Sequence, residues 1–465
     1  MRGRVLEAFG VQDAQQRAWL IALSAEQVPP DERRFVTFFA RGEAAGSVSI
    51  PIPHAIAALD VADIGGAPGP ELLLLAAGEL RILDAQGALV RRIALDPPLP
   101  LPPRTREQSR LEFAGAWSAP EKIEALLPDL GGFRLVALTG AAPPRALRLP
   151  VTAIYGEPQP GPPVRASFFR AALFWPNVFA VDDDGDGTRD LVATTRYGLT
   201  TYRGGAEGLS PEPSRVRRFP AFPFEEERRA DSNLLLPSLA DLDGDGDADL
   251  IVHRTVGTLI GSRAETQIHA NSGGGADPLA APAGSLAVEG GVATAEVMDL
   301  DGDGRAELVQ SVLPFGVGQL GRILVLRRAE LELRVYGFDR AKLGPPQLRW
   351  SQELTLPFDF KTARVTALLP TFAGDFNGDG RRDLLYGDGD GNARIRLGAA
   401  GASFGAEVAS VPLGARGGAA AFVDLDGDRL DEIVFWDPVE PEGRLRIARN
   451  RGKLPGSPPK LTPAR

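Results

Sequence analysis

The chain has no cysteine, only three histidines and no apolar stretch of the length that a membrane helix needs. Without cysteine, neither a disulfide framework nor a thiolate metal site can form. The histidines His54, His253 and His269 are scattered, and no G-x-S-x-G turn supports a nucleophile–histidine–acid set. A basic stripe that could follow nucleic-acid phosphates is also missing. We therefore expect no nucleic acid and no membrane span.

Glycine and proline are abundant instead, with 54 and 40 residues, which favours many short strands joined by turns. Five segments repeat one pattern, in which an acidic loop lies between two β-prone runs. They are VDDDGDGTRDLVAT, ADLDGDGDADLIVH, MDLDGDGRAELVQS, GDFNGDGRRDLLYG and VDLDGDRLDEIVFW. Two incomplete copies of the repeat, around Asp63 and Asp129, keep the flanking β-prone runs and lack the middle carboxylates. The loops recur about every 50 to 75 residues, the length of a four-stranded propeller blade.

Seven such units predict an all-β fold, a single seven-bladed β-propeller over residues 51–450, in preference to six or eight blades. After GRLRIARN the last unit runs into the proline-rich segment 451–465, for which we expect a disordered tail. A fourth strand for the last blade must then come from elsewhere. We expect one of the strands in residues 1–50, RRFVTFFAR or GSVSIPIPH, to complete it and close the ring. The alternative is a small separate cap made from residues 1–50.

Each acidic loop follows the pattern D-x-D-G-D-G-x-x-D, with small variations. Side-chain oxygens at positions one, three, five and nine and the carbonyl of position seven can turn toward one point. Such an oxygen cage suits Ca²⁺, whereas zinc usually takes nitrogen or sulfur ligands. The predicted ligands are Asp182, Asp184, Asp186, Thr188 and Asp190 in loop one; Asp241, Asp243, Asp245, Asp247 and Asp249 in loop two; Asp299, Asp301, Asp303, Arg305 and Glu307 in loop three; Asp375, Asn377, Asp379, Arg381 and Asp383 in loop four; and Asp424, Asp426, Asp428, Leu430 and Glu432 in loop five.

Charge decides between a bound cation and a plain acidic turn. Three or four carboxylates that converge repel one another, and five such loops at matching positions argue for up to five Ca²⁺ ions. An EF-hand loop begins in the same way but needs a glutamate at position twelve and flanking helices. No carboxylate stands at position twelve here, where the residues are Ala193, Val252, Gln310, Tyr386 and Phe435. The EF-hand interpretation is therefore disfavoured.

The motifs DDDGDGTRDL, DLDGDGDADL, DLDGDGRAEL and DFNGDGRRDL resemble the calcium loops of FG-GAP/VCBS repeat proteins, a family that includes the propeller of integrin α subunits. The resemblance is strong over residues 170–450 and faint from about 50 to 150. It implies a seven-bladed propeller, calcium loops between the first two strands of a blade, and a role in adhesion, ligand binding or scaffolding. Arg429 departs from the pattern by replacing the second glycine of loop five, which predicts a strained turn and a weaker site.

We therefore expect a non-catalytic calcium-binding module for adhesion, binding or scaffolding, with a protein or glycan partner. Weak calcium sites favour an extracytoplasmic location, although the first residues, MRGRVLEAFG, lack the features of a signal peptide. The alternatives are a propeller-type polysaccharide lyase or hydrolase and a structural subunit of a surface assembly. Three segments are candidates for recognition: the aromatic residues 166–180, the charged residues 221–233, and residues 322–338, which predict a lengthened hairpin.

Overall fold

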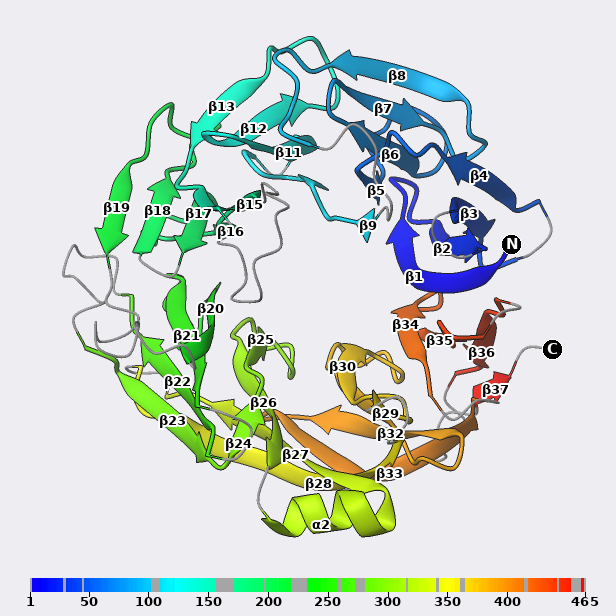
Figure 1. Ribbon diagram of the computed structural model, residues 1–465, viewed down its shortest axis with the longest axis vertical. Coiled ribbons are helices and arrows are strands. Elements are labelled where there is room, and N and C mark those ends of the chain that lie inside the picture. Colours follow the sequence, from blue (N-terminus) through cyan, green and yellow to red (C-terminus); the bar gives the residue numbers. More distant parts are fainter. Residues whose placement is uncertain are drawn as a thin grey trace, which may run out of the picture.

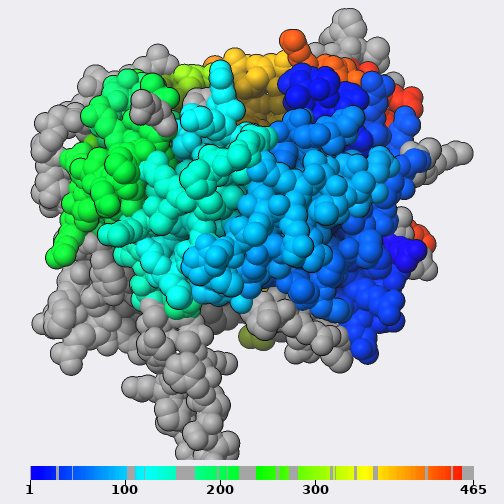
Figure 2. All heavy atoms as spheres, turned by 90° about the horizontal axis from the view of Figure 1, so that it is seen from above, coloured from blue at the N-terminus to red at the C-terminus, as the bar shows by residue number. Residues whose placement is uncertain are grey.

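The computed structural model describes residues 2–27, 31–43, 46–101, 109–119, 121–155, 171–195, 198–206, 208–218, 232–257, 261–271, 281–314, 317–339, 343–359, 364–413, 417–440, 443–452 and 461–463. These residues form a ring of β-sheets around a central axis (Figure 1). In the space-filling view, the N-terminal part of the chain, coloured from blue to green, covers a continuous surface (Figure 2). Among the described residues, no helix is long and apolar enough to cross a membrane.

The first three blades come from the part of the chain without acidic loops. Blade one consists of β1 Arg4–Gln12, β2 Ala18–Glu26, β3 Arg33–Ala40 and β4 Val48–Ile52. Blade two consists of β5 Ala58–Ala62, β6 Glu71–Ala76, β7 Glu79–Leu83 and β8 Leu89–Ala94, with β9 Ser109–Arg110 parallel to β5. Blade three consists of β10 Ala114–Gly115, β11 Glu124–Asp129, β12 Gly132–Ala137 and β13 Arg145–Arg148. A two-stranded ribbon, β14 Thr152–Tyr155 and β15 Ala171–Phe174, follows.

The other blades each carry one acidic loop. Blade four consists of β16 Asn177–Val181, β17 Asp190–Thr195, β18 Gly198–Tyr202 and β19 Arg215–Arg218. Blade five consists of β20 Ser232–Ala240, β21 Asp249–Val256, β22 Arg263–His269 and β23 Gly284–Glu289. Blade six consists of β24 Gly291–Ala293, β25 Glu296–Met298, β26 Glu307–Pro314, β27 Arg328–Gly337, β28 Gln347–Asp359 and β29 Arg364–Val365, with the helix α2 Val317–Leu326 between β26 and β27. Blade seven consists of β30 Thr371–Gly374, β31 Asp383–Gly387, β32 Asn392–Ala399 and β33 Ser403–Pro412. Blade eight consists of β34 Ala419–Val423, β35 Glu432–Trp436, β36 Arg446–Asn450 and β37 Leu461–Pro463.

The middle strands of a blade are largely buried because both of their faces are covered. β6, with the sequence ELLLLA, is buried at its first five positions. The outer strand β8, LVRRIA, alternates between exposed and half-buried residues. The core is accordingly divided among the seams between blades. One cluster, for example, joins Ile21 and Val36 of blade one to Leu59 and Leu72 of blade two.

The described residues form eight blades, so the prediction of seven was wrong. Residues 4–52 contain four β-prone runs that pair in the order β1-β2-β3-β4 and make a complete blade. This blade has neither the D-x-D-G-D-G motif nor a recognisable incomplete copy of it, and these were the signals by which the repeats were counted. The separate cap that residues 1–50 could have formed is not what the structure has either.

The ring closes by packing rather than by strand exchange, which corrects the predicted closure. Among the described residues no N-terminal strand pairs with blade eight; its fourth strand is β37, which pairs with β36 through Ala448 and Pro463. β1 lies beside β34 in Figure 1, and Val5 and Leu20 share a cluster with Val423 and Trp436. Because the sheets are apolar on both faces, burial between the two blades is enough to hold the ends together. Residues 453–460, 464 and 465 of the expected tail lie outside the described residues.

The expected lengthened hairpin over residues 322–338 is correct only from Arg328 onward. β27 and β28 pair from Arg328 with Pro357 to Gly337 with Gln347. The preceding residues, up to Leu326, belong to α2, which lies at the outer edge of the ring (Figure 1). A short apolar run such as RILVL is compatible with a helix or a strand, and here it continues a helix that starts at Val317.

Candidate metal-binding loops

The five acidic loops join the first two strands of blades four to eight, as the resemblance implied. They lie between β16 and β17, β20 and β21, β25 and β26, β30 and β31, and β34 and β35. In each blade the loop therefore follows the strand nearest the axis (Figure 1). This placement repeats one local geometry five times around the ring.

The aspartate at position one organises each loop. Asp182 accepts N–H bonds from Gly185 on Oδ1, at 2.8 Å, and from Gly187 on Oδ2, at 2.7 Å. Asp241, Asp299, Asp375 and Asp424 accept the same pair of bonds from positions four and six of their own loops. These bonds curl the backbone inward, as in other turns that begin with aspartate.

The tight curl needs positive φ at positions four and six. The glycines of loop one have φ values of 70° at Gly185 and 79° at Gly187. At position six of loop five, Arg429 adopts a φ of 67°. A non-glycine residue pays roughly 1–2 kcal/mol in this left-handed region, so the strain predicted at Arg429 is present in the backbone.

The carboxylate at position nine begins the second strand and is buried. One of its oxygens accepts the N–H of position two, at 2.6 to 3.2 Å. Burial raises the pKa of Asp190 to about 6 and the pKa of Asp249, Glu307, Asp383 and Glu432 to about 7, and nearby loop carboxylates add to the rise. Without a compensating cation, these groups ionise less readily than ordinary carboxylates.

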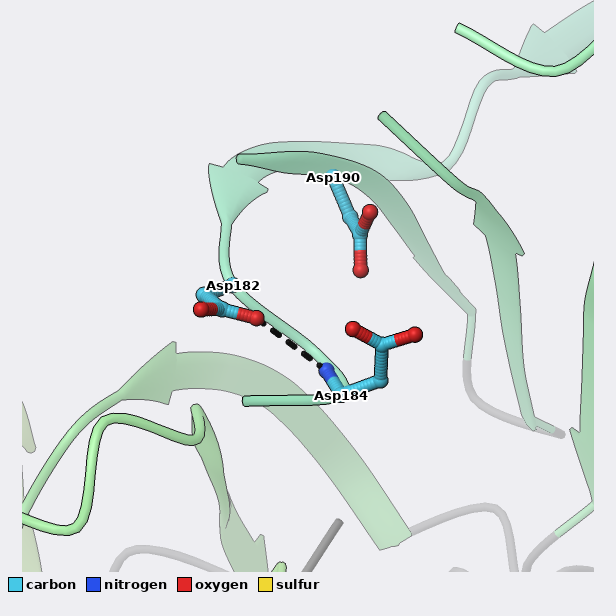
Figure 3. Close-up of side chains that lie close together, drawn as sticks. All are labelled: Asp182, Asp184 and Asp190. Atoms are coloured by element: carbon cyan, nitrogen blue, oxygen red, sulfur yellow. Dashed lines mark hydrogen bonds between the residues drawn. The ribbon is translucent and has the colours of Figure 1, made fainter. Parts of the chain in front are cut away.

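Four loops bring three acidic side chains together, with oxygens within 4.8 Å of one another. The groups are Asp182, Asp184 and Asp190; Asp241, Asp243 and Asp249; Asp299, Asp301 and Asp303; and Asp424, Asp426 and Glu432. Figure 3 shows the carboxylates of Asp184 and Asp190 facing each other beside Asp182. The other predicted acids, Asp186, Asp245, Glu307 and Asp428, lie outside these groups of the described residues.

Loop four differs because position three is an amide. Asn377 donates from Nδ2 to Asp379 Oδ2 at 3.0 Å. In the described part of the chain, Asp375, Asp379 and Asp383 do not form a close acidic group like those of the other loops. Loop four keeps the backbone hydrogen bonds of the other four loops and has one negative charge fewer.

Three of the clustered acids have an oxygen that nothing satisfies. Asp184 Oδ1, Asp301 Oδ1 and Glu432 Oε1 are buried and have no hydrogen-bond partner among the described residues. A buried, unpaired polar atom is costly, and a charged one more so. The residues present therefore fit a hard cation, which would bind these oxygens directly.

Position seven, expected to contribute a carbonyl, has a further role that the spacing did not indicate. Its N–H donates to the position-five carboxylate in all five loops. Its side chain can also face the preceding loop. A Cβ on Gly185 would clash with Asp247 Oδ1, and one on Gly244 would lie 2.6 Å from Arg305 Cδ. Asp247 is 5% exposed, and its Oδ1 has no partner within the described ranges.

Adjacent loops are also joined through their backbones. The N–H of Ala248 donates to the carbonyl of Asp182, at 2.9 Å, and the N–H of Ala306 donates to Asp241, at 2.8 Å. The equivalent bonds run from Arg382 to Leu300 and from Asp431 to Asp375. The loops thus form a continuous arc on one side of the ring, which we call the loop arc (residues 182–190, 241–249, 299–307, 375–383 and 424–432).

Arginines neutralise part of the charge of the loop arc. Arg203 contacts Asp184 Oδ2 at 3.1 Å and Asp186 Oδ2 at 2.7 Å. Arg305 pairs with Asp303, and Arg381 contacts Asp379 Oδ2 at 3.2 Å. The hydrogen bond from Arg203 is the main reason that the pKa of Asp186 lies below its usual value. The oxygens that remain unpaired, such as Asp184 Oδ1, are different from those that the guanidinium groups contact.

The other candidates from the sequence are only partly described. Phe168, Phe169 and residues 221–231 lie outside the described residues. Phe179 packs against the seam between blades four and five, and Trp175 donates from Nε1 to the carbonyl of Asp129 at 2.9 Å. His253 is buried, and its Nδ1 lies 2.9 Å from Thr266 Oγ1.

Comparison with known families adds an assignment for part of the loop arc. Residues 375–435, which contain loops four and five, match the family model described as FG-GAP-like repeat. This segment is similar to an FG-GAP-like repeat. The propeller arrangement of the described residues agrees with that similarity. No curated protein matches the chain.

Several solved structures are similar to the chain at low identity. A lectin of Agrocybe aegerita, described as recognising non-reducing terminal N-acetylglucosamine, has 14% identity and a TM-score of 0.38, with 87% of this chain and 93% of the lectin covered. The V. cholerae biofilm matrix protein Bap1 has 14% identity and a TM-score of 0.30, with 99% and 80% covered. A Bacteroides uniformis protein named as a candidate 6-phosphogluconolactonase has 9% identity and a TM-score of 0.33, with 92% and 90% covered.

Proposed function

We propose that the protein is a calcium-loaded propeller that serves as a non-catalytic binding, adhesion or scaffolding module. The observation that carries the calcium assignment is the set of buried, unpartnered oxygens in the loops, on Asp184, Asp301 and Glu432. A carboxylate oxygen in that position needs a donor or a cation, and the loops supply no further donor to it.

The proposed ligands are those of the sequence pattern. In each loop they are the side chains at positions one, three, five and nine and the carbonyl at position seven. Loops one, two, three and five have a full set of carboxylates, and loop four has Asn377 at position three. Since Ca²⁺ takes six to eight oxygens of mixed type, the amide oxygen of Asn377 is an acceptable ligand with a lower charge. Five ions are the upper limit.

The ions stabilise the ring by linkage. A cation that binds the folded loop and not the unfolded chain adds stability that grows with its concentration. It also favours the ionised form of carboxylates such as those of Asp190 and Asp249, whose pKa burial raises. The role of calcium is therefore structural.

We propose an extracytoplasmic location and a protein or glycan partner. Calcium sites of extracellular modules bind with dissociation constants of about 10⁻⁴–10⁻³ M, and such sites fill only where calcium is abundant. A rigid ring with its loops on one side is a suitable platform for binding, because recognition residues gain precision from a rigid support.

The decisive experiment is a calorimetric titration of Ca²⁺ into chelator-stripped protein, with thermal melting in calcium and in EGTA. We expect binding heat, a higher Tm in calcium and little response to the same concentration of Mg²⁺, which demands a smaller octahedral site. A screen of glycans and proteins in both buffers then tests the partner. The absence of binding heat together with an unchanged Tm would overturn the calcium assignment.

A further inference from the structure

A cleft of about 580 Å³ lies between blades six and seven, beside loop three. It is bordered by loop two at Leu242, by the turn between β27 and β28, and by the turn between β32 and β33 at Ala400–Ala402. Acidic and basic side chains share its lining. The ones that matter here are Asp301, Asp303, Glu307, Arg305, Arg349 and Arg381.

Two of the arginines have donors that the described residues do not use. Arg349 is exposed on β28 and makes no ion pair within the described part of the chain; its side chain lies along Gly337, where a Cβ would be 2.8 Å from Arg349 Nε. Arg381 contacts Asp379 through Nη1, and no hydrogen bond among the described residues uses its Nη2. A guanidinium group with free N–H donors is the side chain best shaped to bind a carboxylate.

Part of the cleft wall, formed by Asp301, Asp303 and Glu307 of loop three, is acidic. Asp301 accepts the N–H of Gly401 on Oδ2, at 2.8 Å, while its Oδ1 is unpartnered, and Glu307 is buried beside it. This wall would repel an anion as long as its charge is not balanced. A cation in loop three would balance it, so anion binding in the cleft and cation binding in the loop favour each other.

The lining indicates a polar ligand of modest size. The volume is within the range of small-molecule sites, about 300–1,000 Å³. The apolar side chains Leu242 and Phe338 are only 1% and 4% exposed, so they offer little surface to an apolar peptide side chain. Gln347, Asp339 and the backbone around Gly401 line the rest and suit hydroxyl groups.

We propose that this cleft binds a carboxylated saccharide, a uronate, whose carboxylate lies between Arg349 and Arg381. Its hydroxyls face Gln347, Asp339 and the turn at Gly401. Calcium in loop three strengthens the binding by neutralising the wall formed by Asp301, Asp303 and Glu307. This last part, and only this part, rests on the calcium assignment proposed above.

The test is a titration of the full chain with oligogalacturonate or glucuronate, with neutral glucose as the control sugar, in calcium and in EGTA. We expect the uronate to bind and glucose not to bind. Arg349→Gln is expected to weaken uronate binding about tenfold, since a charge-assisted bidentate contact is worth more than 1 kcal/mol. Arg322→Gln, an exposed arginine on α2 of the same blade, is the matched control and should leave binding unchanged. Removal of calcium should weaken binding at least fivefold.

The outcomes separate the two proposals. If calcium binds and raises the Tm but uronate gives no signal in either buffer, the cleft assignment is overturned and the calcium assignment stands. If calcium does not bind but uronate binds in an Arg349-dependent way, the cleft assignment stands without its calcium coupling. Equal binding of glucose, or unchanged binding by the Arg349→Gln and Arg381→Gln double variant with a native Tm, would also overturn the cleft assignment.

Discussion

Blades one and two build the same inner turn as blades four to eight without converging carboxylates. In blade one, Asp13 Oδ1 accepts the N–H groups of Gln15 and Arg17, and Oδ2 accepts Arg17 Nε and Trp19 Nε1. In blade two, Glu71 accepts the N–H groups of Ile64, Gly66 and Ala67. Protein donors thus satisfy both oxygens of each carboxylate.

The acidic loops lack such donors at their centres. Asp184 Oδ1 and Glu432 Oε1 are buried and unpartnered in the described chain, whereas Asp13 has a partner on each oxygen. Blades one and two stabilise the turn with donors from the chain. On the calcium assignment proposed above, a cation takes that role in blades four to eight, and their stability should therefore depend on the calcium concentration.

The largest effect is expected on removal of calcium. In EGTA, backbone amides of β17, β21, β26 and β35 should exchange hydrogen much faster, while those of β2 and β6 change little. A site filled at about 100 times its Kd contributes about 2.7 kcal/mol, which corresponds to about 100-fold in local exchange. Hydrogen–deuterium exchange with mass spectrometry measures this. Equal acceleration in all blades would contradict the proposed division of the ring.

A pair of matched substitutions sharpens the comparison. Glu432→Gln removes a proposed ligand of loop five, so it should cost stability in calcium and little in EGTA, and about one ion should be lost in a calorimetric titration. Glu71→Gln in blade two leaves one of three backbone donors facing an amide group, which should cost about 1–3 kcal/mol in both buffers. Urea unfolding gives the free energy of unfolding of each of the two variants in each of the two buffers. An equal calcium dependence of the two variants would contradict the assignment.

The pH dependence of calcium-free protein should have an unusual sign. Burial raises the folded-state pKa of Glu307, Asp383 and Glu432 to about 7, above the ordinary values of 4.5 and 3.8. The folded state then holds more protons than the unfolded state between pH 4 and 7, so stability falls as the pH rises through this range.

In calcium this slope should vanish, because the ion favours the ionised form. Asp13 gives the opposite contribution: burial opposes its ionisation, but hydrogen bonds from Trp19 and Arg17 bring its pKa below 3.8. The stability that the ionised carboxylate of Asp13 contributes is therefore lost as the pH falls. Thermal melting from pH 4 to 8 in EGTA and in calcium checks both signs. A stability that rises with pH in EGTA would contradict the expectation.

The smallest effect concerns the strained turn of loop five. Arg429→Gly should stabilise the protein by about 1 kcal/mol, because glycine adopts the φ of 67° without the steric cost. Gly427→Ala is the matched control: its φ is 83° and no atom lies within 4 Å of the new Cβ, so any loss reflects backbone strain alone. Chemical denaturation in calcium measures both. A loss of stability for Arg429→Gly would show that the arginine side chain makes a compensating contact.

The site was easier to predict from the sequence than the ring that carries it. Acidic residues at alternate loop positions between two apolar runs predict which side chains converge because the loop is a local structure, and Asp182, Asp184 and Asp190 lie together. Their role as calcium ligands stays a prediction. Blade one escaped prediction because its turn uses Asp13, Arg17 and Trp19, a set that matches no repeat. The closure was mispredicted because the pairing of β37 depends on a short segment after a proline-rich stretch.

Contacts between loops could not be predicted because they depend on how blades pack. Asp247 was expected to contribute only its carbonyl to loop two, yet its side chain faces Gly185 of loop one. Likewise, the cleft beside loop three combines residues from three blades: Leu242, Arg349 and Arg381. Spacing along the chain carries no information on such neighbours.

The amide–carbonyl bonds from Ala248 to Asp182 and from Ala306 to Asp241 have a thermodynamic consequence. Each unit of the loop arc is hydrogen-bonded to a neighbouring unit, so, on the calcium assignment proposed above, we expect the occupancy of the sites to follow nearest-neighbour statistics like those of a one-dimensional lattice. An ion that orders one unit lowers the entropy cost of ordering the next. Saturation of the calcium sites would then be steeper than for independent sites. The loop arc would change from flexible to ordered over a narrow interval of calcium concentration.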